Sequence, residues 1–279
     1  MSAPTPPVAR LQLGQLLREL REAAGRARED TAIKLECKTP KISKIETGRA
    51  TIGPGDARLL IELYDADAQT AETVLQLARQ ARKRAPVRVP DWAQRFVAME
   101  SISSAIRIYE AELIPGLLQT EEYTRAVTKA FDPERDTAEV ERLVEVRAER
   151  QALLNSEAPP HLWTVINEAV IRRPVGGAEI MHKQLLRLRE LADLPRVTLQ
   201  VLPFTAGAHA AMGSSFHLLQ MRDPSEAKVI YTEDLASSDY LDGPAQIERY
   251  SLVFDRLQVA ALGETETAAM LDRAIRDGT

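Results

Sequence analysis

The chain has 279 residues, of which 44% are hydrophobic and 28% are charged, and its net charge is −5; this is the balance of a globular protein long enough for two domains. No apolar stretch approaches the roughly 18 residues of a membrane span, and the first residues lack the basic-then-apolar pattern of a secretory signal, so the composition argues against a membrane or secreted protein. The single cysteine, Cys37, excludes an internal disulfide and favours a reducing, cytoplasmic compartment.

The charge is distributed unevenly along the chain. Residues 1–86 carry 15 Lys and Arg against 11 Asp and Glu, whereas residues 87–279 carry 21 against 30. A basic module followed by an acidic body is typical of a protein that binds phosphates locally. Chance fluctuation produces the same asymmetry, so charge alone does not identify a nucleic-acid-binding domain.

A domain of five short helices is expected over residues 8–85, after a Pro-rich tail, residues 1–7, that we expect to be disordered. The first helix has apolar residues at the spacing i, i+3, i+4, i+7 and i+11, namely Leu13, Leu16, Leu17, Leu20 and Ala24. Similar spacings predict four more helices, at Arg28–Glu36, at Pro40–Thr47, and around Ala57–Tyr64 and Ala71–Ala78. Thr39 suits the N-cap of the third helix, and Gly48 suits its end.

The segment LGQLLRELREAAG, which starts at Leu13, and the segment KISKIETGR, which starts at Lys41, carry a family resemblance. They resemble the helix-turn-helix of lambda-repressor-like regulators of the XRE type, with Pro40–Thr47 as the recognition helix. In such domains the recognition helix lies in the major groove of DNA, with its N-terminal part facing base edges.

The resemblance implies a role for each residue that matches the motif. Base edges are the expected targets of Thr39, Pro40, Lys41 and Lys44, and Ser43 lies among them; phosphates are the expected targets of Arg28, Lys38, Thr47 and Arg49. The alternative for the lysines is a solvated helix face; the helix context favours DNA contact for Lys41 and Lys44 and leaves Lys38 and Arg49 open. Arg21 and Glu46 correspond to positions that often form a buried structural ion pair in this family.

The motif departs from the family pattern at the turn. Glu36 stands where the turn usually has glycine, and Lys38 replaces the usual serine cap. A positive φ at Glu36 would cost about 1–3 kcal/mol. A helix that starts one residue later, with Thr39 as its cap, would relieve the missing cap.

A short linker, residues 86–90, is expected to lead to a second domain, residues 91–279. We predict a helix from Asp91 to Tyr109, a charge-rich helix at Pro133–Leu154, and three more at Gly177–Leu191, Pro244–Leu262 and Glu264–Arg276. Four short strands are predicted at His161–Ile166, Arg196–Phe204, Ser215–Met221 and Lys228–Glu233. The predicted fold class is therefore mainly α with a smaller mixed α/β part.

The segments YEAELIPGLLQTEEYTRAV, VTLQVLPFTAGAHAAMGSSFHLLQ and VIYTED carry a second resemblance. They resemble the conserved C-terminal domain of unknown function that follows an XRE-type helix-turn-helix in many actinobacterial regulators. Members of that group resemble antitoxin-like regulators and are often encoded beside a very small acidic partner protein. The resemblance implies no ligand, cofactor or catalytic residue.

Candidate chemistry in the second domain is sparse. His209 and His217 flank a loop, and the alternative of a metal or acid–base set with Glu233 stands against ordinary hydrogen bonding, which we prefer. No spacing of Cys and His is typical of a zinc site, so we expect no metal and no cofactor. A binding pocket at the loop 204–215, lined by Leu117, Leu118, Trp163 and Phe204, is the alternative to plain core packing of these residues.

Three functions remain in view. The first is a transcriptional regulator that binds operator DNA as a homodimer, with a second domain that senses a ligand or a small partner protein. The second is an antitoxin-like interaction module whose DNA binding only regulates its own operon. The third is an enzyme with a DNA-binding appendage; no motif supports it, and we expect the protein not to be an enzyme.

Overall fold

The computed structural model describes residues 6–82, 91–222, 227–235 and 237–278. Contacts within the chain divide it into two compact units, Met1–Ile102 and Ser103–Thr279. The expected linker, residues 86–90, lies outside the described residues, as do the first five residues of the expected tail. The first described helix begins at Pro6 rather than at the expected domain start, because proline is compatible with the first helical turn.

The described residues of the first unit form six helices: α1 (Pro6–Ala23), α2 (Arg28–Lys34), α3 (Thr39–Glu46), α4 (Pro54–Leu63), α5 (Ala68–Ala81) and α6 (Asp91–Ser101). The apolar residues that predicted α1 through α5 form one core, in which Leu13, Leu17 and Leu60 are at most 2% exposed. A hydrogen bond of 2.8 Å between the Thr31 hydroxyl and the Tyr64 hydroxyl joins α2 to the end of α4 inside this core.

Helices α1 and α3 approach each other closely at Gly14, which is buried. A Cβ atom placed on Gly14 would lie 2.3 Å from the Ile45 carbonyl oxygen and 2.8 Å from that of Glu46. Both neighbours are backbone atoms of α3, so a side chain at this position would have to push the two helices apart. Gly14 therefore sets how deeply α3 packs against α1.

The second unit is built on a six-stranded sheet. Its strands are β1 (Ser103–Glu110), β2 (His161–Asn167), β3 (Val197–Leu202), β4 (Phe216–Met221), β5 (Lys228–Glu233) and β6 (Ser238–Leu241). They lie in the order β3-β2-β1-β4-β5-β6. The first three run parallel, and β4, β5 and β6 continue the sheet as antiparallel neighbours.

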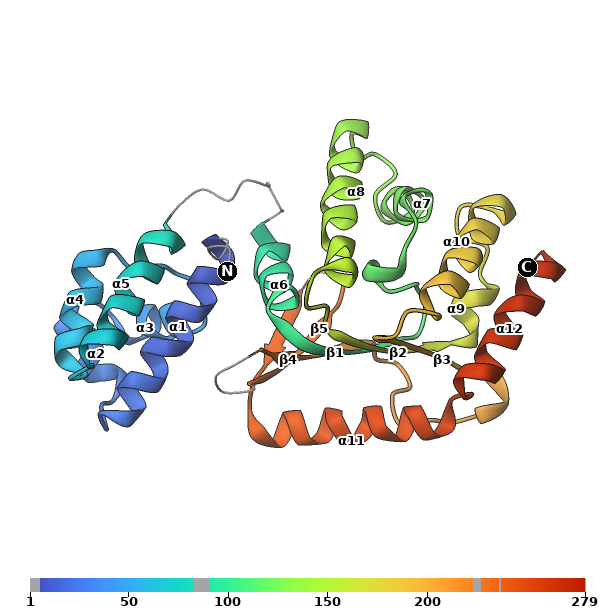
Figure 1. Cartoon of the computed structure of the whole chain (residues 1–279). Coiled ribbons are helices and arrows are strands. Elements are labelled where there is room, and N and C mark those ends of the chain that lie inside the picture. The colour runs from blue at the N-terminus through green and yellow to red at the C-terminus, as the bar shows by residue number, and fades with distance from the viewer. Residues whose placement is uncertain (1–5, 83–90, 223–226, 236, 279) are drawn as a thin grey trace. The chain divides into compact units, whose positions relative to one another are not determined.

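Helices cover this sheet on both faces. The helices are α7 (Glu121–Phe131), α8 (Thr137–Gln151), α9 (Glu168–Arg172), α10 (Ala178–Leu191), α11 (Pro244–Ala260) and α12 (Glu264–Asp277), with short 3-10 turns at Gly116–Leu118, Ala152–Asn155 and Phe204–Ala206. Figure 1 shows α7 to α10 on one face and α11 across the other. On the α11 face, Phe254 packs against Phe216 with ring centroids 6.4 Å apart.

The predicted fold class is confirmed, since the chain is mainly helical with a smaller α/β part. The sheet has six strands where the sequence predicted about four. The helix predicted through Tyr109 was wrong beyond Ser101, because Ser103–Glu110 is strand β1. Ile102 and Ile106 fit a helical spacing, but Ile106 and Ile108 are β-branched and alternate with Arg107, which suits a strand buried between β2 and β4.

We expect Gly14→Ala to lower the free energy of unfolding of the first unit by about 1–3 kcal/mol, because the added methyl group overpacks the contact between α1 and α3. Hydrogen exchange of peptides from α1 to α5 in the full chain measures this local stability. Gly55→Ala in α4 is the matched control, since a Cβ there meets no atom within 4 Å; it is expected to be neutral or to stabilise by up to about 1 kcal/mol. Equal stability of the Gly14 variant and the wild type would contradict this view of the helix contact.

Candidate nucleic-acid interface

The helix-turn-helix motif of the first unit consists of α2, α3 and the turn between them. Each of the two helices has one buried side and one exposed side. Ala32 on α2 and Ile42 and Ile45 on α3 are 4%, 2% and 2% exposed, so one side of each helix is fixed in the core. This burial directs the opposite side of α3 toward solvent. The Gly48 φ of 69° ends α3, and a Cβ there would lie 2.8 Å from Leu11 Cδ2 of α1.

The turn before α3 contains the two departures from the family pattern. Glu36 has a φ of 47°, the left-handed conformation that glycine adopts without strain. Helix α3 begins at Thr39, so Lys38 is its N-cap, and the Lys38 side chain makes no capping hydrogen bond. The expectation that Thr39 caps a helix starting one residue later was therefore wrong, since Thr39 already has a helical conformation. Two features therefore lower the stability of the turn: the strained backbone at Glu36 and the missing side-chain cap at Lys38.

Behind α3, Glu46 lies between two arginines. Its Oε1 accepts a hydrogen bond from Arg21 Nε of α1 at 2.5 Å, and its Oε2 accepts one from Arg28 Nε of α2 at 2.8 Å. The Glu46 side chain is 2% exposed and that of Arg21 is 9% exposed. The hydrogen bond to Glu46 raises the pKa of the Arg21 guanidinium above its ordinary value. This cluster connects the three helices of the motif through one buried carboxylate.

The residues expected to contact bases lie on the outward side of α3. Lys41, Lys44 and Pro40 are exposed, and Thr39 and Ser43 are half-buried. Lys38 and Arg49, exposed before and after the helix, extend the row of cations at both ends. The structure thus brings these side chains to one continuous segment of surface.

Two residues expected at phosphates are engaged within the protein. Arg28 uses its Nε to bind Glu46, and its side chain is 39% exposed. The Thr47 hydroxyl donates to the Ser43 carbonyl at 2.8 Å, so its single donor serves the end of α3. Arg28 keeps its two Nη groups for an external anion, whereas Thr47 would have to exchange an internal hydrogen bond for a contact with phosphate.

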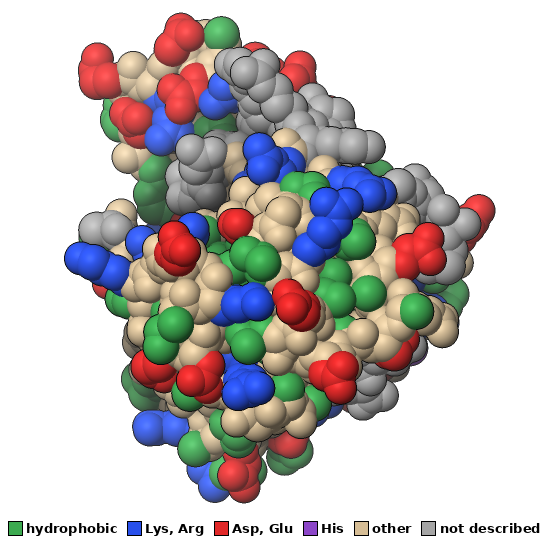
Figure 2. Space-filling model, turned by 90° about the vertical axis from the view of Figure 1, so that its left-hand side faces the viewer, with side chains coloured by type: hydrophobic (Ala, Val, Ile, Leu, Met, Phe, Trp, Pro, Cys, Tyr) green, Lys and Arg blue, Asp and Glu red, His purple; other side chains and the backbone are tan. Residues whose placement is uncertain are grey.

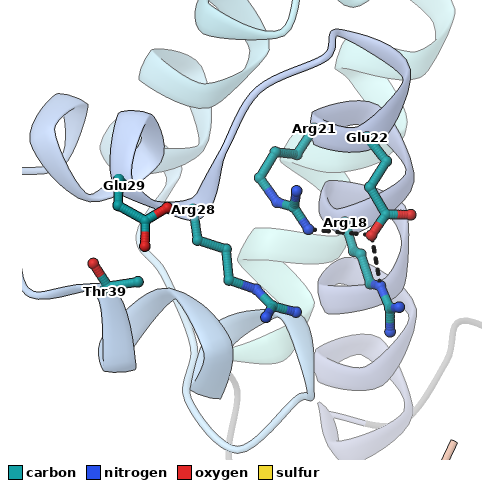
Figure 3. A pocket seen from close by; sticks show the side chains of 6 residues that line it. All are labelled: Arg18, Arg21, Glu22, Arg28, Glu29 and Thr39. Atoms are coloured by element: carbon teal, nitrogen blue, oxygen red, sulfur yellow. Dashed lines mark hydrogen bonds and ion pairs between the residues drawn. The ribbon is translucent and has the colours of Figure 1, made fainter. Parts of the chain in front are cut away.

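An open cavity of about 500 Å³ lies where α1, α2 and α3 meet, and its lining residues are Arg18, Arg21, Glu22, Arg28, Glu29 and Thr39. Figure 3 shows Arg28 between Glu29 and Thr39 on one side and the α1 residues on the other. Arg18 was not among the site residues predicted from the sequence. Its pairing with Glu22 four residues later is typical of a solvated helix surface, and no pattern in α1 indicates that this pair faces α2.

On the face of the molecule that Figure 2 shows, Lys and Arg side chains are interspersed with Asp, Glu and apolar side chains. No broad basic surface dominates that face. The positive charge available to a nucleic acid therefore comes from the individually positioned cations of α3 and its flanks rather than from a broad basic surface.

The histidines of the second unit do not assemble the alternative set with Glu233. His209 Nε2 lies 3.4 Å from the Tyr109 hydroxyl, and His217 Nε2 lies 3.3 Å from Glu110 Oε1. Tyr109 and Glu110 are neighbours on β1, so their side chains point to opposite faces of the sheet. Glu233 instead accepts a hydrogen bond of 2.9 Å from the Tyr231 hydroxyl. Within the described ranges, no group of His, Cys, Asp or Glu side chains is arranged to hold a metal ion.

The residues suggested to line a pocket in the second unit differ in their exposure. Leu117 and Leu118 are 2% and 0% exposed and belong to the core. Trp163 is half-buried beside Arg107, whose guanidinium carbon lies 5.6 Å from the centre of its ring. Phe204 is 59% exposed. Core packing is therefore the better account of Leu117 and Leu118.

Comparison with known families gives two matches. Residues 93–273, more than half of the chain, match the family described as a domain of unknown function, DUF5753. Residues 12–74 match the family described as a helix-turn-helix domain. No curated protein and no solved structure matches the chain. None of the described helices combines the length and the apolar character that a membrane span requires.

We expect Glu46→Ala to lower the free energy of unfolding of the first unit by about 3–5 kcal/mol, because it leaves the buried Arg21 guanidinium without its carboxylate. The paired replacement Arg21→Met with Glu46→Leu should cost less than Glu46→Ala alone, since it removes both charges. Hydrogen exchange of α1 to α5 provides the measurement.

Glu62→Ala is the control for this prediction, because the Lys34–Glu62 pair is exposed, with the Glu62 side chain 74% exposed. Its expected cost is about 0–1 kcal/mol. A cost for Glu46→Ala no larger than that of the control would show that the buried pair does not stabilise the motif.

Proposed function

Because the chain belongs to the DUF5753 family and carries a helix-turn-helix domain ahead of that domain, we propose that it is a sequence-specific regulator of transcription that binds operator DNA as a homodimer. The helix-turn-helix match supports a DNA-binding regulator. The homodimer and the sequence specificity are parts of the proposal.

The observation that carries this proposal is the outward side of α3. Lys41 and Lys44 are exposed one turn apart, while Ile42, Ile45 and Glu46 fix the opposite side of the helix. A helix held in this way presents its N-terminal half to the major groove, where lysine can donate to guanine O6 and N7. Lys38 and Arg49 would then meet the backbone phosphates on either side, which fixes the register of the helix.

A homodimer would place two copies of α3 on half-sites about 34–36 Å apart, one turn of the DNA helix. We propose that the second domain supplies the regulation, by binding a ligand or a small partner protein. Such binding would change operator affinity only through a difference in affinity between the DNA-bound and free states. We assign no catalytic role to the protein.

The double variant Lys41→Ala/Lys44→Ala is expected to lose operator binding. Each base contact of this kind is worth about 1–3 kcal/mol, so the loss should be at least about 30-fold. The measurement is fluorescence anisotropy of the full chain on DNA from upstream of its own gene, compared with scrambled DNA of the same length, at several salt concentrations. The wild type should prefer the upstream fragment, and this preference should disappear in the variant.

The matched control is Arg58→Ala/Arg79→Ala, which removes the same charge from exposed positions on α4 and α5. It should retain the preference for the upstream fragment. Equal losses in both double variants would mean that only the net charge matters. Equal, weak binding of the wild type to both DNAs would refute recognition of this operator.

A further inference from the structure

Helix α11 carries an apolar stripe on the side that faces away from the sheet. Ala245, Leu252 and Val259 follow one another at intervals of seven residues, which places them on one side of a helix. Ala245 is exposed, and Leu252 and Val259 are 49% and 88% exposed. Figure 1 shows no other described element of the second unit on the outer side of α11. A helix that covers one face of a sheet normally has a polar outer side, so this stripe is a candidate contact surface.

The rotation of α11 about its own axis is fixed by its contacts with the sheet. Phe254 and Leu257 on its inner side are completely buried. The ring of Tyr250 packs edge-on against that of Phe216 of β4, with ring centroids 4.9 Å apart. Because these contacts hold the inner side against the sheet, the stripe is directed outward.

Charges of opposite sign border the stripe. Glu248 and Asp255 form an acidic flank on one side of it, and Arg249 and Arg256 form a basic flank on the other side. At 3.6 residues per turn, each flank lies about 40–60° around the helix axis from the centre of the stripe. All four side chains are exposed, and Asp255 also pairs with Arg107 of β1 at 3.3 Å. The outer side of α11 therefore has one negative and one positive border.

Three of these four charges have no partner within the part of the chain that the structure describes. Charged side chains on other helices of the second unit commonly pair with a residue three or four positions away, as Arg125 does with Glu121 at 3.1 Å. The sequence places no opposite charge at these distances from Glu248, Arg249 or Arg256. Their separation into two flanks prevents pairing within α11 and leaves them for a second molecule.

We propose that the stripe and its two flanks form the surface through which two copies of this chain associate, with the two α11 helices parallel. The proposal rests on the homodimer proposed above and names its contact surface. A two-fold axis parallel to the helices turns the basic flank of one copy toward the acidic flank of the other. Glu248 then meets Arg249 of the second copy, and Asp255 meets Arg256. An antiparallel pair would bring like flanks together, so the charge pattern selects one orientation.

The length of α11 limits the strength of this association. The helix has 17 residues and is therefore about 25 Å long. One side of a single helix of this length covers less than the roughly 800 Å² per partner that stable interfaces bury. The dimer should therefore be weak in free solution. It should be strengthened when the first units of both copies bind one operator, since the second association is then intramolecular.

The test reverses one charge on each flank. Arg249→Glu places an acidic side chain opposite Glu248 of the second copy, and Glu248→Arg places a basic one opposite Arg249. Each variant alone is expected to dimerise at least about tenfold more weakly than the wild type, because the two-fold axis doubles the repulsion. An equimolar mixture of the two variants should regain the affinity of the wild type, since opposite charges then face each other. Sedimentation velocity of the full chain at several concentrations, free and on the upstream fragment, measures the association.

Arg142→Glu, a charge reversal at an exposed position of α8, is the matched control and should leave the dimer unchanged. Tighter association of Arg249→Glu would indicate an antiparallel pair and refute the proposal, as would a mixture that associates no better than each variant alone. Unchanged dimers in both variants would exclude this surface and leave the proposed homodimer standing. A wild type that stays monomeric, free and on DNA, would refute the homodimer as well.

Discussion

The carboxylate of Glu46 is the group on which the helix-turn-helix part of this protein depends. A carboxylate with 2% exposure is stable as a charge only if its oxygens are paired, and both are taken by arginines from other helices. The same residue ends α3, so the orientation of α3 is fixed by the distances to Arg21 and Arg28. Lys41 and Lys44 point away from the core. Their direction is set by the hydrogen bonds of Glu46 and by the close packing of α3 against α1 at Gly14.

In the second unit, buried amide side chains support irregular backbone beside the sheet. The segment 114–120 follows β1 without forming a strand or a long helix, so its backbone groups need partners from side chains. Gln184 of α10, which is fully buried, donates to the Leu118 carbonyl at 2.8 Å and accepts from the Thr120 amide at 2.7 Å. Gln119 similarly donates to the Ile114 carbonyl at 2.6 Å. These amide side chains explain why polar residues occur deep in an apolar region.

At the β3 edge of the sheet, residues from outside the sheet likewise bond to backbone groups. The Val201 amide of β3 donates to the Thr267 hydroxyl at 3.1 Å, and the Val201 carbonyl accepts from the Leu262 amide at 2.9 Å. The outer hydrogen-bonding groups of Val201 on β3 are therefore satisfied by Leu262, between α11 and α12, and by Thr267 of α12. These two bonds make this part of the edge less able to pair with another chain. Gln119, Gln184 and Thr267, the buried polar residues of these two contacts, thus have structural explanations, and they do not by themselves indicate a ligand.

Sequence alone predicted the parts of the fold that depend on local periodicity. The helices of the first unit follow from the spacing of Leu13, Leu17 and their equivalents. The strands β2 to β5 follow from short apolar runs, which are β-branched in β2, β3 and β5. Strand β1 was missed because an isoleucine every four residues satisfies the helical period as well, and only its burial between β2 and β4 decides. The position of Arg18 at the cavity could not be predicted, because it depends on which helix packs beside α1, and no local pattern encodes that packing. His209 and His217 are close in sequence, but they contact Tyr109 and Glu110, whose side chains alternate between the two faces of β1. Predicting this separation requires the register of β4 on β1 to be known.

The two destabilising features of the motif are the positive φ of Glu36 and the missing side-chain cap at Lys38. Both lie in the turn between α2 and α3. A positive φ at Glu36 costs about 1–3 kcal/mol, and a missing side-chain cap costs about 1 kcal/mol. Both are tolerated because Ala32 and Ile42, on either side of the turn, are buried and the Glu46 cluster holds the two helices from behind. The conformation of the turn is thus stabilised by tertiary contacts rather than by the conformational preferences of its own residues. It will change if those contacts change. Because Arg28 of α2 and Glu46 at the end of α3 share a hydrogen bond of 2.8 Å, a displacement of Arg28 would be transmitted directly to α3.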